Sequence, residues 1–483
     1  MKRSDLQQNA RQYINGRWET GVTTGISENP SDTREVVAEY ARADRNQTEL
    51  AIRAAADAFP HWSQTTPQRR ADVLDQIGSE ILVRREELGK LLAREEGKTL
   101  PEAIGEAARA GHIFKFFAGE ALRGDGETLA SVRPGVQVDI TREPLGVVGL
   151  ITPWNFPFAI PAWKIAPALA YGNSVVFKPA ELVPACGWAL AEIISRAALP
   201  AGTFNLVMGS GREVGQSIVD SPLVDAISFT GSVVTGEHIL QAATRRRAKV
   251  QLEMGGKNPL VVLADADLDR AVDCAVQGAY FSTGQHCTAS SRLIVESTVH
   301  DAFVSRVRHR LAALKIGHAL AQGTDIGPVV DRHQLERNLA AIESATAEGA
   351  EHMGGGERLN RATTGYYMSP ALFLAKPEHR VARDEIFGPV ACVLRADDYE
   401  HALVLANDTP FGLCAGICTT SLARAMHFKR HARVGMTMVN LPTAGVDYHV
   451  PFGGRKASSY GPREQGRHAA EFYTTVKTGY VLA

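Results

Sequence analysis

The sequence predicts an α/β protein with two parallel sheets, each covered by helices. The 483 residues are enough for two or three domains with sizeable cores. Short apolar segments alternate with windows of helical periodicity twice, first over residues 147–252 and again over residues 260–394. This alternation is typical of repeated strand–helix–strand units, which form parallel sheets with helices on both faces.

Helices are predicted first along the chain, as scaffold over residues 46–93. Apolar side chains recur there at helical spacing between charged ones, namely Leu74, Ile77, Ile81, Leu88 and Leu91. The first alternating series predicts strands at residues 147–151, 174–178, 204–208, 225–229 and 250–252, and helices at residues 161–171, 185–198, 213–219 and 234–244. The second series predicts strands at residues 260–263, 292–295 and 391–394, and helices at residues 268–280, 299–314 and 333–347.

Two segments fit neither series. Residues 136–142 and 471–481 alternate polar and apolar side chains and are rich in strand-forming residues. Strands that join no core sheet often pair across a subunit interface, so these two segments predict an oligomer.

Composition excludes several classes of protein. With 52 Lys and Arg against 53 Asp and Glu, the formal charge is −1, so no overall field exists to hold nucleic acid or an anionic membrane. The most apolar stretch, residues 145–170, is interrupted by four prolines and is predicted to be buried rather than membrane-spanning. Six cysteines are too few for a disulfide framework and form no CxxC pair, which predicts a cytoplasmic protein without a metal site.

Cys287 is the first candidate for chemistry. It lies in FSTGQHCTASS after Gly284 and Gln285, where the backbone can approach a ligand and small polar neighbours leave the thiol accessible. Such a thiol would act as a nucleophile. The alternative is a small buried apolar residue, which describes most cysteines.

Glu253 and Asn155 are candidates for supporting roles. Glu253 ends a predicted strand before two glycines, where a crevice at the carboxyl end of the sheet can raise its pKa and make it a general base. Asn155 lies in ITPWNFPF between two prolines that fix the backbone, so its amide can donate to a developing oxyanion, a contact of about 3 kcal/mol. The alternatives are a turn or cap carboxylate for Glu253 and a rigid packing corner around Asn155.

Two glycine-rich turns compete for a dinucleotide pyrophosphate. Residues 204–215 and residues 229–236 each place a strand before glycines and a helix, and spacing alone does not choose between them. Lys178 and Glu181 follow a predicted strand, where they can bind the hydroxyl groups of an adenosine ribose. The alternative for these two side chains is a solvated ion pair at a loop.

Together these motifs resemble the NAD(P)-dependent aldehyde dehydrogenase superfamily. The resemblance covers essentially the whole chain and rests on seven motifs in the order and spacing of that family. They are WNFP at residues 154–157, FKPAE at 177–181, FTGS at 229–232, LEMGGKNP at 252–259, GQHC at 284–287, EIFGPV at 385–390 and PFGGRK at 451–456.

The resemblance implies a fold of three parts. These are a Rossmann-like cofactor domain (residues 1–127 and 146–253), an α/β catalytic domain (residues 254–440) and a β oligomerisation flap (residues 128–145 and 467–483). A linker at residues 441–466 is expected to line the substrate mouth. A homodimer or homotetramer is implied as well.

A mechanism is also implied. The Cys287 thiolate adds to an aldehyde, its own N–H and the Asn155 side chain hold the oxyanion, hydride passes to the nicotinamide, and Glu253 activates the water that hydrolyses the thioester. Lys164 joins this catalytic set. A free thiol of pKa about 8.5 is mostly protonated at pH 7, so Glu253, a helix N-terminus or the bound cofactor must activate it. Members that transfer the acyl group to coenzyme A generally lack the carboxylate, so Glu253 favours hydrolysis to the free acid.

The cofactor site implied by the resemblance uses the second glycine turn, with Gly231 and Ser232 nearest the pyrophosphate and the first turn near the adenine. Glu181 favours NAD, because a carboxylate repels a 2′-phosphate, although some relatives with a matching Glu also accept NADP. The expected cofactor residues are Ile151, Thr152, Trp154, Lys178, Glu181, Gly211, Phe229, Gly231, Ser232, Met254, Glu385 and Phe387.

The substrate is the least defined part of the resemblance. The expected tunnel residues are Phe156, Trp163, Phe281, His286, Thr288 and Phe452. Succinic semialdehyde dehydrogenases typically place arginines at the positions of Trp163 and Phe281. The unusual residues 441–450 and 456–466 instead resemble the bacterial α-ketoglutaric semialdehyde (2,5-dioxopentanoate) dehydrogenases. That aldehyde is the expected substrate, with succinic semialdehyde or a broad range of aliphatic and aromatic aldehydes as alternatives.

No arginine or lysine is assigned to the carboxylate of such a substrate. The candidates near the mouth are His286, Ser290, Ser291, Tyr448 and His449. Two functions of other classes remain open: a catalytically silent binding or structural homologue, and an enzyme that forms acyl-coenzyme A.

Overall fold

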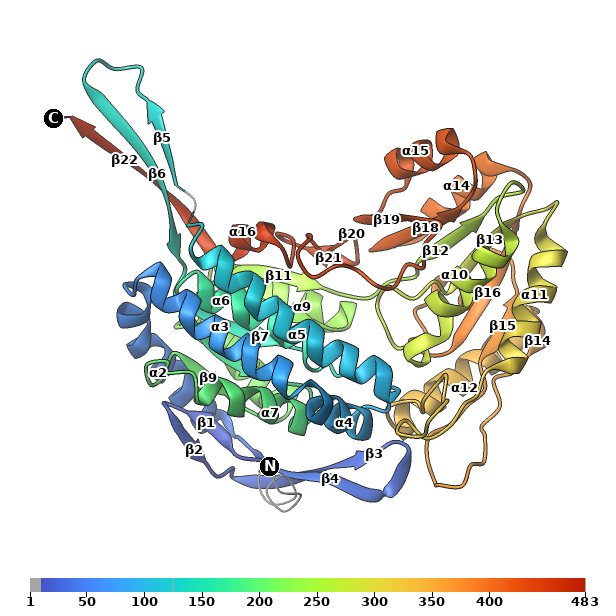
Figure 1. Cartoon of the computed structure of the whole chain (residues 1–483), viewed down its shortest axis with the longest axis horizontal. Helices are drawn as coiled ribbons and strands as arrows, with labels where there is room; N and C mark the ends of the chain where they lie inside the picture. The colour runs from blue at the N-terminus through green and yellow to red at the C-terminus, as the bar shows by residue number, and fades with distance from the viewer. Residues whose placement is uncertain (1–9, 125, 483) are drawn as a thin grey trace.

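The computed structural model describes residues 10–124 and 126–482, which form two lobes and a projecting arm (Figure 1). One sheet organises each lobe. The strands of the first sheet, in spatial order, are β2 (Arg17–Glu19), β1 (Gln12–Ile14), β9 (Phe204–Leu206), β8 (Ser174–Lys178), β7 (Val147–Ile151), β10 (Ala226–Thr230), β11 (Lys249–Glu253) and β21 (Ser459–Tyr460).

The centre of this first sheet is parallel. Strands β9, β8, β7, β10 and β11 run in one direction, and the antiparallel strands lie at the edges. The order along the sheet reverses between β7 and β10, so connections leave these two strands on opposite sides. Such a switch point opens a crevice at the carboxyl ends of the strands, where α/β proteins bind ligands.

Helices cover both faces of the first sheet and add a further layer. They are α2 (Arg45–Ser63), α3 (Pro67–Val83), α4 (Arg85–Glu95), α5 (Leu100–Ala121), α6 (Ala159–Ala170), α7 (Pro184–Ser195), α8 (Gln216–Asp220) and α9 (Val233–Arg245). Every residue of α6, β7 and β8 is buried, as parallel strands and their covering helices require. The predicted helix at residues 213–219 is instead a π-helical turn, η1 (Gly211–Gly215), followed by α8.

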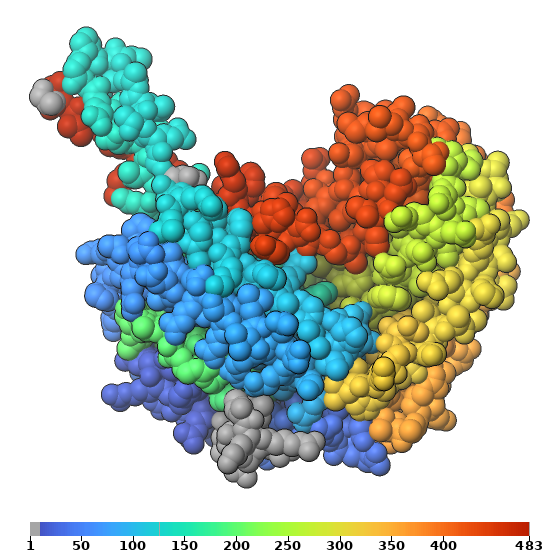
Figure 2. All heavy atoms as spheres, in the orientation of Figure 1, coloured from blue at the N-terminus to red at the C-terminus, as the bar shows by residue number. Residues whose placement is uncertain are grey.

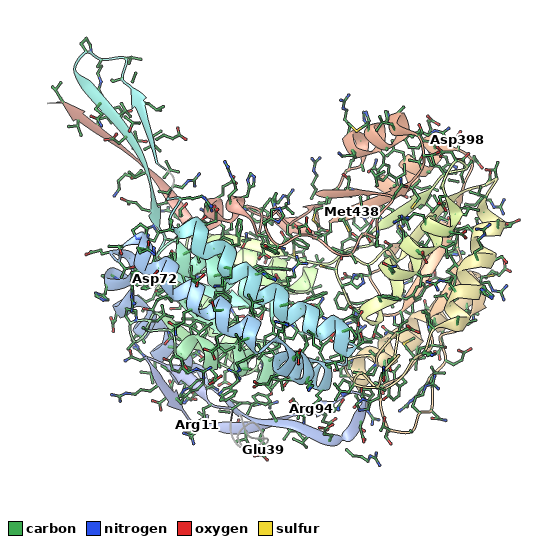
Figure 3. The ribbon with its side chains drawn as sticks, viewed as in Figure 1. Arg11, Glu39, Asp72, Arg94, Asp398 and Met438 are labelled. Atoms are coloured by element: carbon green, nitrogen blue, oxygen red, sulfur yellow. The ribbon has the colours of Figure 1, made fainter. Side chains whose placement is uncertain are left out.

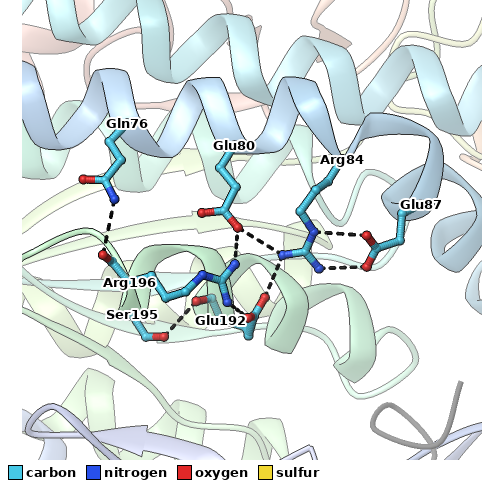
Figure 4. Close-up of polar contacts among 7 residues, drawn as sticks. All are labelled: Gln76, Glu80, Arg84, Glu87, Glu192, Ser195 and Arg196. Atoms are coloured by element: carbon cyan, nitrogen blue, oxygen red, sulfur yellow. Dashed lines mark hydrogen bonds and ion pairs between the residues drawn. The ribbon is translucent and has the colours of Figure 1, made fainter. Parts of the chain in front are cut away.

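Charge pairs join three of these helices. Arg84 pairs with Glu80 of α3, Glu87 of α4 and Glu192 of α7, and Arg196 pairs with Glu80 and Glu192 as well (Figure 4). These contacts fix how α7 lies against α3. Other charged side chains fringe the outside of both lobes, such as Asp72 on α3 and Asp398 at the start of α14 (Tyr399–Asn407) (Figure 3).

The second sheet is parallel apart from one edge strand. Its spatial order is β14 (Glu351–Gly354), β15 (Ala371–Leu374), β16 (Val390–Ala396), β13 (Arg292–Glu296), β12 (Pro259–Val262), β18 (Cys414–Cys418) and β19 (Met436–Val439). Its larger helices are α10 (Leu268–Tyr280), α11 (His300–Ala313), α12 (Arg332–Ala347), α14 and α15 (Leu422–His431). The predicted strands and helices of both series are therefore confirmed to within a few residues, whereas β14, β15, β18, β19, α14 and α15 were not predicted.

The arm contains the two segments that fitted neither series. Strands β5 (Glu127–Ala130), β6 (Val136–Pro144) and β22 (Thr474–Leu482) form an antiparallel sheet in which β6 is central. The prediction of a strand from residue 471 is wrong at its start, because α16 (Ala470–Tyr473) precedes β22. The arm stands clear of the body of the molecule (Figure 2).

Smaller elements complete the fold. A hairpin of β3 (Thr23–Asn29) and β4 (Asp32–Arg42) lies under the first lobe, and β17 (Phe411–Gly412) pairs with β20 (Arg455–Lys456). The short helices are η2 (Phe281–Gly284), α13 (Arg380–Arg383) and η3 (Arg467–Ala469). Across residues 10–124 and 126–482, no helix is both long and apolar enough to cross a membrane.

Candidate active site

A cavity of about 410 Å³ lies between α5, α6, the loop around Cys287 and the segment that follows β19. This volume is typical of a site for a small molecule. Its lining is mostly apolar and includes Lys98, Glu102, Gly105, Glu106, Arg109, Phe156, Trp163, Phe281, His286, Cys287, Thr288, Val446 and Phe452.

The loop before Cys287 has a strained backbone. Ser282, Thr283 and Gly284 all have left-handed conformations, with φ of 49°, 57° and 65°. Only glycine fits at 284, because a Cβ there would lie 2.2 Å from the carbonyl oxygen of Gly388. The Ser282 N–H donates to the Glu102 carboxylate at 2.8 Å. The loop is therefore held at both its ends, which fixes the approach to Cys287.

The motif LEMGGKNP holds the other side of Cys287. The Asn258 amide donates to the carbonyl oxygens of Cys287 (2.7 Å) and Ala289 (3.0 Å). Asn258 in turn accepts a hydrogen bond from the Cys414 N–H in the second sheet. Gly256 is required beside them, since a Cβ at this position would lie 2.4 Å from the Cys287 carbonyl oxygen.

Asn155 is buried beside the nucleophile loop. Its side-chain amide donates to the Gln285 carbonyl at 3.0 Å, and its own carbonyl accepts from the Lys98 ammonium at 2.8 Å. An Asn amide has two N–H groups, so one remains for an oxyanion formed next to Cys287.

Glu253 ends β11 and is almost fully buried. Ser459, opposite it on β21, donates to its carboxylate at 2.5 Å. Burial raises the pKa of Glu253 well above its usual range and the neighbouring Glu464 raises it further, whereas Ser459, Lys164 and Arg463 lower it. The group therefore has the raised basicity that a general base needs near neutral pH.

Lys164 does not line the cavity. Its ammonium is fully buried, donates to Ser228 at 2.7 Å and pairs with Glu464. It acts on Glu253 through charge, so within the expected catalytic set it is a positioning residue.

The environment of the Cys287 thiol opposes ionisation. Burial raises the pKa of this thiol, and the carboxylates of Glu385 and Glu253 raise it further. Glu253 was one of three expected sources of thiol activation, but its negative charge disfavours the thiolate.

The expected cofactor residues gather at the switch point of the first sheet. Ser232 caps α9, whose first N–H groups and dipole suit a phosphate. Among the residues that the structure describes, the buried hydroxyls of Thr152 and Thr230, at the ends of β7 and β10, have no hydrogen-bond partner. Trp154 packs edge-on against Phe387, with ring centroids 5.4 Å apart. These donors and rings fit a dinucleotide that crosses the ends of β7 and β10.

Glu385 and its neighbours fit a ribose on the side of the second lobe. One Glu385 oxygen accepts from the Gly256 N–H at 2.8 Å, and burial raises its pKa to about 7. Gly255 leaves room for this carboxylate, since a Cβ there would lie 2.2 Å from it. Met254 packs on Gly236 of α9, below the expected pyrophosphate.

Lys178 and Glu181 do not form a solvated ion pair, so that alternative is wrong. Lys178 is buried and donates to the Pro179 carbonyl at 3.0 Å, and burial lowers its pKa to about 8. Glu181 is half-exposed and lies 3.8 Å from Arg42. The two remaining N–H groups of the Lys178 ammonium can donate to ribose hydroxyls, and the Glu181 carboxylate can accept from them. Of the other expected cofactor residues, Ile151 ends β7, Phe229 lies in β10 and Gly211 begins η1.

All six expected substrate residues line the cavity. Trp163 stacks on Phe452 with centroids 5.4 Å apart, which gives one aromatic wall. His286 is buried and its pKa is lowered to about 4 by burial and by Lys98, so its ring is neutral at pH 7.

The other candidates for a substrate carboxylate lie outside the cavity lining. Ser290 is fully buried and bonded to Thr443, and Tyr448 stacks on His112. Ser291 and His449 do not line the cavity either. Of the five candidates, the structure therefore brings only His286 to the cavity wall.

The cavity-lining face of α5 was not predicted from the sequence. Glu102, Gly105 or Glu106, and Arg109 recur at steps of three and four residues and share one side of α5, and Lys98 lies just before its start. A polar stripe of this spacing was a detectable signal.

Comparisons with known proteins agree with this geometry. The family described as the Aldehyde dehydrogenase family matches residues 18–479. The alpha-ketoglutaric semialdehyde dehydrogenase of Bacillus subtilis is 42% identical over 476 residues, 97% of each chain. The alpha-ketoglutarate semialdehyde dehydrogenase of Haloferax volcanii is 40% identical over 98% of each chain. A betaine aldehyde dehydrogenase of Staphylococcus aureus, solved in complex with NAD+, is 34% identical with a TM-score of 0.96, covering 99% of this chain and 96% of that one.

The fold and the comparisons therefore define an oxidoreductase that uses a nicotinamide cofactor. The chain belongs to the aldehyde dehydrogenase family, which confirms the predicted fold and the prediction of an NAD(P)-dependent aldehyde dehydrogenase. Within the described residues, no group of three or more His, Cys, Asp or Glu is arranged to hold a metal ion.

Proposed function

We propose that this enzyme oxidises α-ketoglutaric semialdehyde to α-ketoglutarate with NAD as the cofactor. The observation that carries the proposal is one cavity in which Cys287 faces a mostly apolar wall, in a chain 42% identical to an α-ketoglutaric semialdehyde dehydrogenase. Trp163 and Phe281 line this cavity where succinic semialdehyde dehydrogenases typically have arginines. That difference favours the longer keto acid over succinic semialdehyde.

The residues divide the oxidation into two steps. The Cys287 sulfur adds to the aldehyde carbon, and the free N–H of Asn155 and the Cys287 backbone N–H stabilise the oxyanion. When bound, NAD supplies the hydride acceptor that leaves a thioester on Cys287. Lys178, Glu181, Ser232 and Glu385 would hold that cofactor.

Glu253 completes the cycle. Its buried carboxylate takes a proton from water, which attacks the thioester and releases the acid and the free thiol. The pair of Lys164 and Glu464 sets the charge around Glu253 during this step. Hydrolysis rather than transfer to coenzyme A follows from this base.

The test is a panel of aldehydes with NAD and with NADP. It contains α-ketoglutaric, glutaric and succinic semialdehydes together with pentanal and benzaldehyde, and it measures NADH or NADPH formation and the acid product. The proposal expects the highest kcat/KM for α-ketoglutaric semialdehyde with NAD, because Glu181 repels a 2′-phosphate. A plain aldehyde that exceeds it by a wide margin would contradict the substrate, and no reduction with any aldehyde would indicate a silent homologue.

The arm supports an oligomer of two or four copies. Strand β22 pairs with β6 on one side only, and Leu129, Tyr480 and Leu482 are exposed on the arm. An open edge with apolar side chains is typical of a strand that pairs with another chain. Light scattering after gel filtration measures the mass in solution, and the mass of a monomer would exclude the oligomer. The six free cysteines favour a reducing compartment such as the cytoplasm.

A further inference from the structure

We infer that Arg109 is the residue that binds the distal carboxylate of the substrate and so determines the preference for semialdehydes that carry a carboxylate. This inference rests on the proposed function, since it concerns the far end of the same aldehyde. It follows from the partners of each charged side chain on the cavity face of α5, which runs from the junction of the two lobes toward the arm (Figure 1).

The two glutamates of this face are fully used by backbone groups and by Lys98. Glu102 accepts from Ser282 N–H at 2.8 Å and from the Thr99 hydroxyl at 2.6 Å. Glu106 accepts from the N–H groups of Phe158 and Ala159 at the start of α6, at 2.9 and 3.2 Å. These carboxylates therefore position the walls of the site rather than compete for a ligand.

The Lys98 ammonium is also occupied by contacts within the protein. Its ammonium pairs with Glu106 at 2.7 Å, donates to the Asn155 carbonyl at 2.8 Å and lies 3.7 Å over the centre of the Phe156 ring. Its side chain is buried, and its charge is neutralised by the neighbouring glutamates. Two of its three N–H donors are therefore used, and a second anion would have to compete with Glu106 for its charge.

Arg109 is the cation that remains. In the part of the chain that the structure describes it makes no ion pair within 4 Å, and its one hydrogen bond is a long contact of 3.3 Å to the Gln465 side chain. Its buried Nε–H has no partner within residues 10–124 and 126–482, and its guanidinium lies 5.9 Å from the centre of the Trp163 ring. Burial lowers its pKa although the charges of Glu106 and Asp447 act in the opposite direction, so the guanidinium is held at a net cost that a bound carboxylate would offset.

The chemistry and size of the substrate suit this arrangement. A guanidinium presents planar N–H donors that match a carboxylate, and a partly desolvated pair is stronger than one in water. In 2,5-dioxopentanoate four carbon–carbon bonds of about 1.5 Å separate the aldehyde carbon from the carboxylate carbon. Arg109 and Cys287 line one cavity of about 410 Å³, and the inference places the aldehyde carbon at Cys287 and the carboxylate at Arg109 within it.

Arg109→Met and Arg109→Lys test the inference, with Lys115→Met as the matched control. Lys115 also lies on α5, but it pairs with Asp75 and Ser79 away from the cavity, so its loss removes one charge from the helix without touching the site. The substrates are α-ketoglutaric semialdehyde and pentanal, which has the same chain length and no charge. Glutarate, an unreactive dicarboxylate, is titrated by calorimetry as a direct measure of binding.

We expect Arg109→Met to lower kcat/KM for the semialdehyde by roughly 30-fold or more, mainly through KM, and to leave pentanal within about twofold. Glutarate binding should weaken in parallel, and Arg109→Lys should restore part of both losses because it keeps the charge. The melting temperature of each variant shows that it is folded.

The outcomes separate this inference from the proposed function. Equal losses for the semialdehyde and pentanal, or no loss for either, would overturn the role of Arg109 even if the wild type prefers the semialdehyde. A wild-type preference for pentanal would overturn the proposed substrate. If glutaric semialdehyde were the better substrate and still depended on Arg109, the inference would stand and the proposed substrate would be wrong.

Discussion

The two walls of the cavity are built in different ways. The wall that carries Cys287 consists of strand ends and loops in which glycines let the backbone approach within contact distance. The wall formed by α5 is a regular helix whose charged side chains reach across to other elements. In the proposed function the first wall performs the reaction, and in the inference about Arg109 the second recognises the substrate. On this account chemistry depends on close backbone contacts, whereas selectivity depends on one face of a helix.

Replacement of the nucleophile gives the largest expected effect on the first wall. Cys287→Ala removes the sulfur that adds to the aldehyde, so kcat should fall by about 10⁴-fold or more for every aldehyde, measured as NADH formation. Cys274→Ala is the matched control, since it removes a buried cysteine of α10 outside the cavity lining. An active Cys287→Ala variant would exclude covalent catalysis by this residue.

The base should give the next largest effect. Glu253→Gln keeps the size and the Ser459 contact but loses the carboxylate that takes a proton from water, so turnover should slow by about 10²- to 10⁴-fold. A first burst of NADH equal to the enzyme concentration should remain, because thioester formation precedes hydrolysis. Glu336→Gln, an exposed carboxylate on α12, serves as the control. Steady-state rates equal to those of the parent would remove Glu253 from this role.

A glycine on each wall tests the comparison directly. Gly256→Ala places a Cβ 2.4 Å from the Cys287 carbonyl oxygen, and the resulting displacement of the nucleophile should cost about 10²-fold in kcat/KM. Gly105→Ala on α5 meets no heavy atom within 4 Å and should stabilise the helix by up to about 1 kcal/mol without a comparable loss. Activity with pentanal and the melting temperature measure both. Similar losses for the two variants would mean that the walls do not differ in this way.

The same contrast explains which features the sequence predicts. Parallel strands such as β7 and β8 are continuous apolar segments between helical windows, so both sheets could be placed to within a few residues. The nucleophile wall could be located because its close approaches require small residues in short motifs such as GQHC and LEMGGKNP. Roles within those motifs came from the family resemblance rather than from spacing.

The helical wall could not be predicted in the same way. What singles out Arg109 is that Lys98 pairs with Glu106, whereas Arg109 forms no ion pair within 4 Å among the described residues, and this depends on where Glu106 points after folding. No local sequence pattern shows which charged side chain will find an ion-pair partner after folding. For the same reason the sequence could not show that His286 would be a neutral side chain in the site, since burial sets its pKa. The sequence also predicted two strands of the arm that belong to neither sheet. It could not show how these strands pair or that α16 precedes β22, because both depend on contacts between residues far apart along the chain.

The smallest expected effect is a shift in the pH dependence of thiol reactivity, and it sharpens the account of the first wall. Burial, Glu385 and Glu253 all raise the pKa of Cys287, so alkylation by iodoacetamide without NAD should be slow at pH 7 and should reach half its maximal rate above the ordinary thiol pKa of about 8.5. Removal of a carboxylate favours the thiolate, so this midpoint should move to lower pH in Glu253→Gln and further in Glu385→Gln, whose carboxylate has the larger influence. Mass spectrometry of the Cys287 peptide measures it. A midpoint that rises in Glu253→Gln would instead show that Glu253 activates the thiol, and one base would then serve both halves of the reaction.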